Sequence, residues 1–466
     1  MNRRIQNIHF VGIGGIGMCG LAELLHSQGY RISGSDLRAG QDFERLTGLG
    51  IDTCLGHDPR NLSDAQVVVV SSAIPADNPE LAEARARKIP IIRRAEMLAE
   101  IMRRGDGIAV AGSHGKTTTA SLITHVLDAA GLDPTAVIGG RVMGTGQGPS
   151  GARLGRSDLV VAEADESDGS FLSLRPVITV ITNIDQEHMD HYGDFDALQE
   201  AFVDFANRIP FWGTAVVCIE HPGVQAVMPR LRRRLTTYGF SSQADWVASE
   251  IQSDAMGTRF EVHHDGRRLG EVTLTLPGRH NVLNALACLA VADEFDVNFS
   301  VAATSLAHFG GVERRFQRLG QARGIEVVDD YAHHPAELRA TLAAARSLHT
   351  GRIVAVFQPH RYTRTRDCLN EFATAFNDSD LLVVTEIYAA GEDSIAGVSG
   401  QGLADAVSAY GHRAARFVPE FDDLAPILAK ELAAGDLVLT LGAGSIDQLG
   451  PRLLEILQGD RSGEVE

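Results

Sequence analysis

The chain has 466 residues, and 42 lysines and arginines against 60 aspartates and glutamates give it a formal net charge of −18. This acidity argues against nucleic-acid or anionic-membrane binding as the main role, although a local basic site can still bind an anionic substrate. The five cysteines show no paired spacing, which is typical of reduced thiols and not of a disulfide framework or a zinc site. Because the sequence has neither a signal-peptide core nor an apolar run long enough to cross a bilayer, we expect a cytoplasmic protein without membrane insertion.

Short apolar runs alternate with helical patterns along the whole chain, which predicts an α/β fold. Several of these runs are rich in valine and isoleucine, as strands of parallel sheets covered by helices tend to be. The runs are residues 8–11, 67–70, 108–111, 159–162, 177–181, 353–357, 381–384 and 437–441. We expect three domains: a Rossmann-like domain at 1–106, a phosphate-loop ATPase-type α/β domain at 107–313 and a Rossmann-like α/β domain at 314–466.

A glycine-rich turn follows the first strand. Residues 12–17 read G-x-G-x-x-G before a helical pattern, and Asp36 follows the next strand-like run, 31–33. The turn predicts a diphosphate at a helix N-terminus, from a dinucleotide or equally from a nucleotide sugar, with Asp36 on a ribose. His57 and the Ser71-Ser72 pair follow further strands, where open sheets bind ligands, but a surface histidine and a hydroxyl-rich turn explain them nearly as well.

The second domain opens with a phosphate-loop pattern. Residues 110–119 read V-A-G-S-H-G-K-T-T-T between a strand and a helical pattern at 120–130. Successive backbone N–H groups of such a loop point at phosphate oxygens, Lys116 reaches the outer phosphates and the Thr117 hydroxyl ligates Mg²⁺. The pattern predicts a nucleoside triphosphate, although Val110 stands where the commoner G-x-x-x-x-G-K-[ST] has glycine.

Two acidic segments follow later strands of the same domain, E-A-D-E-S-D at 163–168 and T-N-I-D-Q-E-H-M-D-H at 182–191. Carboxylate ligands at strand ends beside a phosphate loop suit Mg²⁺, whereas each segment alone would read as a solvated loop. Zinc bound by His188 and His191 is a weaker interpretation, because no matching cysteine or further histidine pair is present.

Three further segments carry polar side chains after a turn or a strand. His280 and Asn281 enter a buried helix and are suited to bind a nucleobase, while helix capping is the alternative for Asn281. Residues 329–335, D-D-Y-A-H-H-P, follow the strand-like run 325–328, and residues 358–367 bring three arginines and His360 to the end of another strand. Arginines in that position favour binding of a carboxylate or phosphate, against a solvated basic loop.

Taken in order, these motifs resemble the Mur ligases of peptidoglycan synthesis. The resemblance rests on residues 112–118, 163–168, 188–190, 278–284 and 329–335. Residues 11–18, 34–36, 71–74, 357–367 and 388–392 are closer still to the members that join L-alanine to UDP-N-acetylmuramate. The resemblance implies an ATP- and Mg²⁺-dependent, amide-forming ligase that works through an acyl phosphate, with one domain each for the UDP-sugar, ATP and the amino acid.

The resemblance also implies roles for individual residues. It makes Lys116, Glu163 and His188 catalytic, and it makes Thr117, Glu163 and His188 the metal ligands. It assigns ATP to Gly112, Ser113, His114, Gly115, Lys116, Thr117, Thr118, His280, Asn281, Arg314 and Asp330. It assigns the UDP-sugar to Gly14, Gly15, Ile16, Gly17, Asp36, His57, Ser71 and Ser72, and the amino acid to Tyr331, His333, His360, Arg361 and Arg364. One departure concerns a carbamylated lysine that helps several members hold a second Mg²⁺, because the corresponding segment 205–208 has Asn207 and no lysine.

Several alternatives stay open. Within the family, a recycling ligase would add a tripeptide to the same sugar nucleotide, and a folate-type polyglutamate ligase would lack the first domain. Outside the family, the chain would be an NAD-binding oxidoreductase with a regulatory ATP site, or an inactive binding module, which the intact Lys116, Glu163 and His188 disfavour. The expected partners are the small molecules UDP-N-acetylmuramate, L-alanine and ATP, with no nucleic acid, and the oligomeric state is open, a homo-oligomer included.

Overall fold

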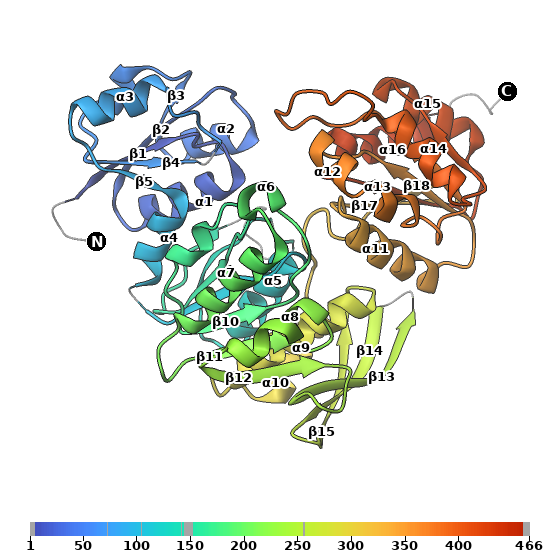
Figure 1. Cartoon of the computed structure of the whole chain (residues 1–466), viewed down its shortest axis with the longest axis horizontal. Helices are drawn as coiled ribbons and strands as arrows, with labels where there is room; N and C mark the ends of the chain where they lie inside the picture. The colour runs from blue at the N-terminus through green and yellow to red at the C-terminus, as the bar shows by residue number, and fades with distance from the viewer. Residues whose placement is uncertain are drawn as a thin grey trace. The chain divides into compact units, whose positions relative to one another are not determined.

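The computed structural model of the chain describes residues 5–71, 73–103, 105–140, 142–143, 152–254 and 257–459. Three consecutive parts of the chain each build their own sheet, which gives the predicted three-domain α/β fold (Figure 1). The chain divides into two compact units, one made of Met1–Glu250, Phe260–Thr273 and Leu283–Gly310, the other of Ile251–Arg259, Leu274–Val282 and Gly311–Glu466. The domain boundaries at residues 106 and 313 stay predictions.

The first sheet has the strand order β3-β2-β1-β4-β5, and its strands run parallel. Its strands are β1 (Asn7–Val11), β2 (Arg31–Asp36), β3 (Asp52–Leu55), β4 (Val67–Val70) and β5 (Ile91–Arg93). Its helices are α1 (Ile16–Ser27), α2 (Gln41–Gly48), η1 (Pro59–Leu62), α3 (Pro79–Ala86) and α4 (Arg94–Met102). The strand order reverses between β1 and β4, and open sheets bind ligands beyond the carboxyl ends of the strands at such a point.

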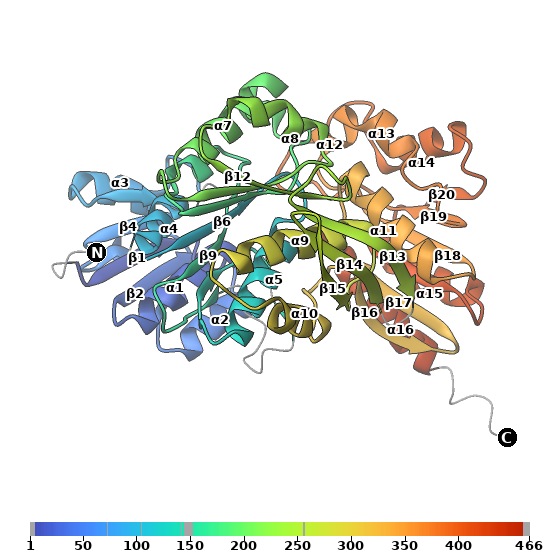
Figure 2. The same ribbon diagram turned by 90° about the horizontal axis from the view of Figure 1, so that it is seen from below.

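The second sheet has the order β15-β14-β13-β12-β11-β10-β6-β9-β7-β8. Its strands are β6 (Gly107–Ala111), β7 (Thr135–Val137), β8 (Ala152–Arg153), β9 (Val160–Glu163), β10 (Ile178–Ile181), β11 (Thr214–Cys218), β12 (Arg234–Gly239), β13 (Trp246–Asp254), β14 (Gly257–His264) and β15 (Arg267–Leu274). The helices of this part are α5 (Lys116–Ala129), η2 (Ser170–Ser173), α6 (Met189–Tyr192), α7 (Phe195–Asn207), α8 (Pro222–Val227), η3 (Met228–Arg230), α9 (Arg279–Asp293) and α10 (Phe299–Ala307). Strand β6 lies between β9 and β10 and runs parallel to both, and α5 packs against α10 (Figure 2).

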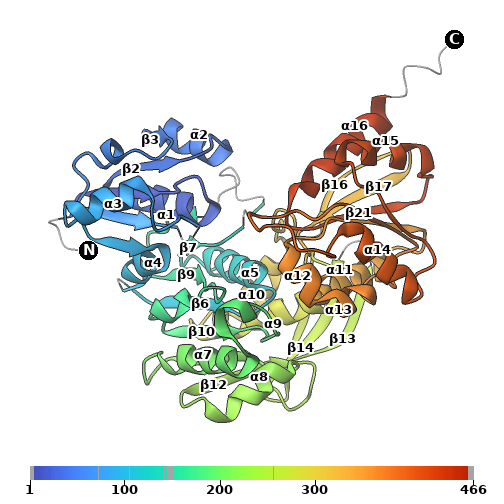
Figure 3. The same cartoon turned by 45° about the horizontal axis from the view of Figure 1, so that its top comes forward.

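The third sheet has the order β16-β17-β21-β18-β19-β20, in which only β16 is antiparallel to its neighbour. Its strands are β16 (Gln317–Ala322), β17 (Ile325–Asp330), β18 (Ile353–Phe357), β19 (Leu381–Val384), β20 (Ala415–Phe417) and β21 (Leu437–Leu441). Its helices are α11 (Pro335–Leu348), α12 (Tyr362–Asp367), α13 (Leu369–Ala373), α14 (Gly400–Ala409), α15 (Phe421–Glu431), η4 (Ser445–Gln448) and α16 (Leu449–Gly459). Two neighbouring residues of β18 belong to different cores: Phe357 packs with residues of α11, α13 and α14, and Val356 packs with residues of α15 and α16. These two groups of helices cover opposite faces of the sheet (Figure 3).

All eight predicted strands are present, with ends that differ by at most one residue. Two other strands run further than predicted: β2 reaches Asp36 and β17 reaches Asp330, so both aspartates are the last residues of strands. Parallel pairing uses only main-chain groups, so a polar side chain does not end it. Helix α5 begins at Lys116, four residues earlier than the predicted helix. Among the described residues, no helix has the length and apolar character needed to cross a membrane.

Candidate active site

The loop between β6 and α5 is shaped by two glycines. Gly112 has φ 130°, and a Cβ there would lie 2.1 Å from the hydroxyl oxygen of Thr182. Gly115 has φ 81°, and a Cβ there would lie 2.8 Å from the side-chain oxygen of Asn284. Side chains are excluded at both positions by conformation and by space. Gly115 directly precedes α5, so the N-terminus of this helix lies at the carboxyl edge of the sheet. A helix N-terminus attracts anions.

The phosphate loop is held by the segment that follows β10. The side-chain oxygen of Asn183 accepts the N–H of His114 at 2.7 Å, and its carbonyl oxygen accepts the N–H of Ser113 at 3.3 Å. These two N–H groups were predicted to point at phosphate, but in the structure both are donated to Asn183. The N–H groups in the first turn of α5 have no helical acceptor and so are suited to bind an anion, and phosphate binding by this turn and by the loop stays a prediction. Thr117 and Thr118 lie in that turn and are buried.

Lys116 forms an ion pair with a carboxylate that the sequence did not single out. Its Nζ lies 2.9 Å from Glu166 and also donates to the carbonyl oxygens of Gly112 (2.6 Å) and Ser113 (3.2 Å). Burial lowers the pKa of Lys116, but Glu166 and the neighbouring carboxylates outweigh it and raise that pKa above its usual range. Burial raises the pKa of Glu166 to about 7 although Lys116 opposes it. Among the described residues, the Oε2 atom of Glu166 has no hydrogen-bond partner.

Thr117 and Glu163, two of the predicted metal ligands, lie together. The Thr117 hydroxyl lies 3.1 Å from both carboxylate oxygens of Glu163, the last residue of β9. The N–H of Gly139 donates to Glu163 at 2.8 Å and orients the carboxylate. A hydroxyl and a carboxylate are oxygen donors of the kind that Mg²⁺ prefers, so these residues fit the predicted ion.

His188, the third predicted ligand, lies beside two other carboxylates. It has φ 60° directly before α6, and its Nε2 lies 3.7 Å from Glu166 and 3.5 Å from Glu187. His191, the partner in the zinc alternative, is exposed, and its ring meets Tyr192 edge-on at 4.7 Å. Glu166 thus joins Lys116 to His188, a link that was hidden because the segment 163–168 contains four acidic residues that look alike in sequence.

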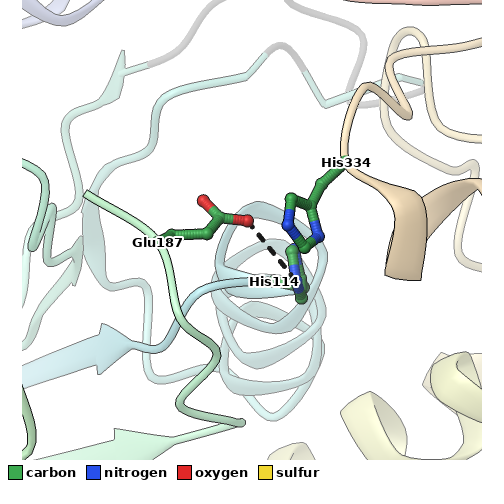
Figure 4. A group of neighbouring side chains, drawn as sticks. All are labelled: His114, Glu187 and His334. Atoms are coloured by element: carbon green, nitrogen blue, oxygen red, sulfur yellow. Dashed lines mark ion pairs between the residues drawn. The ribbon is translucent and has the colours of Figure 1, made fainter. Parts of the chain in front are cut away.

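Asp185 bonds to two residues of the phosphate loop, and the sequence had not singled it out. Its two carboxylate oxygens lie 2.9 Å from His114 and 3.1 Å from His221, and its N–H donates to the Ser113 hydroxyl at 2.9 Å. Burial raises the pKa of Asp185, but the hydrogen bonds from the two histidines outweigh it and hold that pKa well below its usual range. His114 also forms an ion pair with Glu187 at 3.5 Å (Figure 4). Nε2 of the predicted ATP residue His114 therefore faces two carboxylates, those of Asp185 and Glu187.

His280 and Asn281 lie in the first turn of helix α9, which begins at Arg279, so they enter a helix as predicted. Burial, together with the charge of Arg315, lowers the pKa of His280 to about 4, so its imidazole is neutral near pH 7. The Asn281 side chain donates to the carbonyl oxygen of Pro277 at 2.7 Å and so closes the turn that enters the helix. Binding of a nucleobase by these two residues stays a prediction.

In the first domain, the end of β2 holds the glycine turn. The N–H groups of Gly12 and Ile13 donate to the Ser35 carbonyl oxygen at 2.8 and 3.0 Å. The N–H of Gly14 donates to a carboxylate oxygen of Asp36 at 2.9 Å. Asp36 was predicted to bind a ribose from a loop, whereas the structure places it at the strand end and commits one of its oxygens to the turn.

The other residues predicted for the UDP-sugar lie at the same edge of the first sheet. Gly15 and Gly17 lie at the start of α1, and Ser71 follows β4 directly. His57 follows β3, and its Nδ1 lies 3.0 Å from the Ser35 hydroxyl. Ser72 and the side chain of Ile16 lie outside the described residues.

The residues predicted to hold the amino acid gather at the carboxyl edge of the third sheet. The His333 ring lies 5.2 Å from Tyr331 and 5.7 Å from His360, and Arg364 approaches His360 at 3.4 Å. Burial, followed by the charges of His333 and Arg364, lowers the pKa of His360 to about 3, so this histidine is neutral near pH 7. Arg361 is exposed and directly precedes α12, so the expected helical turn begins there.

Tyr388 and Gly444 lie beside this cluster, and their contacts were not predicted. Tyr388 stacks on His360 with 5.5 Å between ring centroids and 10° between planes. A Cβ on Gly444 would lie 2.6 Å from the Tyr388 ring and 2.4 Å from the side-chain oxygen of Gln358. The loop after β21 therefore packs closely against the cluster, and glycines in a loop carry too little pattern to show this in sequence.

Arg314 and Asp330, predicted for ATP, both make contacts within the third domain. Asp330 was expected in a loop, but it ends β17 and accepts the N–H of Phe316 at 2.7 Å. Burial raises the pKa of Asp330 to about 6. Arg314 donates to Asp329 at 2.9 Å and to the Gly442 carbonyl oxygen at 2.6 Å. These bonds fix the carboxyl edge of the sheet, and contact with ATP stays a prediction for both residues.

Asn207, which stands where several family members have a lysine, binds a neighbouring segment. Its amide donates to the Arg230 carbonyl oxygen at 3.2 Å and accepts the N–H of Arg232 at 2.7 Å. Both ends of this side chain are thus used at the C-terminal end of α7. Asn207 therefore has a clear role in the fold that requires no metal.

The chain is similar to Mur ligases along most of its length. Residues 7–105 match the sequence profile "Mur ligase family, catalytic domain", residues 110–292 match "Mur ligase middle domain" and residues 314–444 match "Mur ligase, glutamate ligase domain". A protein of Myxococcus xanthus named UDP-N-acetylmuramate–L-alanine ligase is 56% identical over 456 residues, which cover 98% of this chain and 96% of that protein.

Two further proteins of that name give the same result. The one from Syntrophotalea carbinolica is 53% identical over 458 residues, which cover 98% of this chain and 99% of that protein. The crystal structure of the one from Thermotoga maritima has a TM-score of 0.83 and 30% identity, and the match covers 98% of this chain and 100% of that chain. From the three profiles and these full-length similarities, we conclude that the chain belongs to the Mur ligase family.

Proposed function

We propose that the chain joins L-alanine to the lactyl carboxylate of UDP-N-acetylmuramate at the expense of ATP, in peptidoglycan precursor synthesis. The observation that carries this proposal is the sequence identity of 56%, over 98% of the chain, with the Myxococcus xanthus protein named UDP-N-acetylmuramate–L-alanine ligase. The phosphate loop with Lys116 is intact in the structure, which disfavours an inactive binding module. The reaction consumes ATP and a UDP-linked sugar, which suits an enzyme of the cytoplasm.

The proposed chemistry has two steps that balance without an enzyme nucleophile. The lactyl carboxylate attacks the γ-phosphorus of ATP, the bond to ADP breaks, and an acyl phosphate forms. The neutral amine of alanine then attacks the acyl carbon and loses a proton, and phosphate leaves. Such transfers need positioning and charge neutralisation more than covalent help.

The residues of the central domain supply that neutralisation. Lys116 stays cationic and can exchange its ion pair with Glu166 for one with the γ-phosphate. The first turn of α5 presents N–H groups to the phosphates. Mg²⁺ held by Thr117 and Glu163, with His188 as the third proposed ligand, would neutralise charge on the phosphate oxygens.

The first prediction is that phosphate release by the purified chain requires ATP, UDP-N-acetylmuramate and L-alanine together. The product should gain one alanyl residue by mass spectrometry. Replacing alanine by the tripeptide L-alanyl-γ-D-glutamyl-diaminopimelate should give no release, and robust turnover with the tripeptide alone would identify the recycling ligase instead. A change in nicotinamide absorbance without phosphate release would identify an oxidoreductase.

The second prediction concerns the capture of alanine by the third domain. Arg364→Lys should raise the alanine concentration for half-maximal rate at least tenfold, because a lysine cannot form the two-point bond of a guanidinium with a carboxylate. Arg361→Ala should act in the same direction with a smaller effect, since this side chain is exposed. The KM values for ATP and the UDP-sugar should stay within about twofold of the wild type. The matched control is Arg339→Lys on α11, and a loss confined to ATP would move Arg364 to the nucleotide site.

A further inference from the structure

A buried carboxylate lies under the edge of the first sheet that is proposed to bind the UDP-sugar. Glu80 is the second residue of α3, and it is 0% exposed. Its N–H donates to the side chain of Asn78, which caps the helix, at 2.9 Å. Burying a carboxylate is costly unless its oxygens are fully bonded, so its surroundings must compensate for the loss of water. The proposed reaction does not use Glu80.

Four hydrogen bonds satisfy the carboxylate of Glu80. Oε2 accepts from the Ser35 hydroxyl at 2.6 Å and lies 3.4 Å from Nε2 of His9. Oε1 accepts from the Asn61 side chain at 2.6 Å and from the N–H of Asp58 at 3.2 Å. Burial raises the pKa of Glu80, but the bonds from His9, Ser35 and Asn61 outweigh it and lower that pKa below its usual value. Glu80 is therefore ionised near pH 7.

Ser35 connects this carboxylate to the ligand edge. Its hydroxyl has a single proton, which it donates to Glu80, so its oxygen accepts from Nδ1 of His57 at 3.0 Å. A neutral His57 then carries its proton on Nδ1 and presents Nε2 as an acceptor. The Ser35 carbonyl oxygen accepts the N–H groups of Gly12 and Ile13 in the glycine turn. Ser35 thus contacts Glu80, His57 and the glycine turn, and Nδ1 of His57 also lies 3.6 Å from Oε2 of Glu80 directly.

We propose that Glu80 is a positioning residue for the sugar nucleotide. The negative charge of Glu80 orients the Ser35 hydroxyl, and Ser35 in turn selects the tautomer of His57. In that tautomer, Nε2 of His57 accepts a hydrogen bond from a hydroxyl group of the ribose or the sugar. The same carboxylate bonds to Asp58 and Asn61 in the segment that follows His57, so these contacts also act on the position of His57. This proposal rests on the proposed function, in which this edge binds UDP-N-acetylmuramate.

The test uses the full-length Glu80→Gln variant, which keeps the shape of the side chain and removes its charge. Calorimetry should show at least a tenfold rise in the Kd for UDP-N-acetylmuramate, while kcat at saturating substrate and KM for ATP stay within about twofold. Asp64→Asn is the matched control: it removes an exposed carboxylate of the same domain, bonded to Asn7 at 2.7 Å, and should leave the Kd unchanged.

A double-mutant cycle separates positioning from a general loss of structure. Because Glu80 acts through His57, Glu80→Gln/His57→Ala should bind the sugar nucleotide as weakly as His57→Ala alone. Ser35→Ala should raise the Kd in the same direction, which keeps the test decisive if thermal unfolding shows that Glu80→Gln does not fold. An unchanged Kd in Glu80→Gln, additive losses in the cycle, or an equal loss of ATP affinity overturns the proposal. A wild-type chain that binds no UDP-N-acetylmuramate overturns the proposed function itself.

Discussion

Replacing Lys116 with alanine is expected to lower kcat by about 10²–10³-fold, because it removes the cation that we propose neutralises charge developing on the transferred phosphoryl group. The side chain already lies at the phosphate loop, bonded to the Gly112 and Ser113 carbonyl oxygens, so substrate has only to replace Glu166 as its anionic partner. Phosphate release at saturating ATP, UDP-N-acetylmuramate and alanine measures the effect. Lys430→Ala, an exposed lysine on α15, is the matched control and should keep the wild-type rate.

The same substitution has a second effect that must be separated from the first. Loss of Lys116 leaves Glu166, which is 1% exposed, without its cation, so the carboxylate must either stay buried as an uncompensated charge or take up a proton, and both outcomes lower the stability of the fold. The double variant Lys116→Ala/Glu166→Gln removes that uncompensated charge and should regain much of the thermal stability while kcat stays low. If the double variant recovers the wild-type kcat, Lys116 serves the fold and not the reaction.

The positions of the functional loops follow from sequence because a single rule applies to parallel sheets: ligand-binding loops leave the carboxyl ends of the strands. The acidic segment 163–168 and Lys116 were predicted from that rule and from the phosphate-loop pattern, and Glu163 ends β9 while Lys116 begins α5 beside it. The carboxyl edge of the third sheet likewise brings His333 and His360 together from loops 27 residues apart in the chain.

The pairing of side chains within those loops could not be predicted. Glu166 and Glu163 lie three residues apart in one acidic segment, yet one is bonded to Lys116 and the other to Thr117. Which carboxylate is buried depends on how the loop turns after β9, and no periodicity reports this. Asp36 raises a related difficulty, since an aspartate at a strand end looks the same in sequence whether it binds a ribose or the main chain; here one of its oxygens accepts the N–H of Gly14, and ribose binding stays a prediction.

Glu163→Gln is expected to raise the Mg²⁺ concentration for half-maximal rate at least about tenfold and to lower kcat at saturating Mg²⁺. The amide keeps the size of the side chain and one oxygen to accept the N–H of Gly139, so the local fold should persist. What is lost is the negative charge, and a neutral oxygen is a much weaker ligand for a hard divalent ion. Because Glu163 also orients the Thr117 hydroxyl, Thr117→Val should shift the Mg²⁺ requirement in the same direction.

The measurement is a Mg²⁺ titration of phosphate release, with Mn²⁺ binding followed by electron paramagnetic resonance as a readout that does not depend on turnover. Glu200→Gln, an exposed carboxylate on α7 of the same domain, is the matched control and should leave both unchanged. Comparing His188→Ala with Glu163→Gln is sharper, because His188 lies beside Glu166 and Glu187, whereas the Thr117 hydroxyl is bonded to Glu163. If Thr117, Glu163 and His188 share one ion, Glu163→Gln and His188→Ala should both weaken Mn²⁺ binding. An unchanged Mn²⁺ affinity in either variant would remove the substituted residue from the metal site.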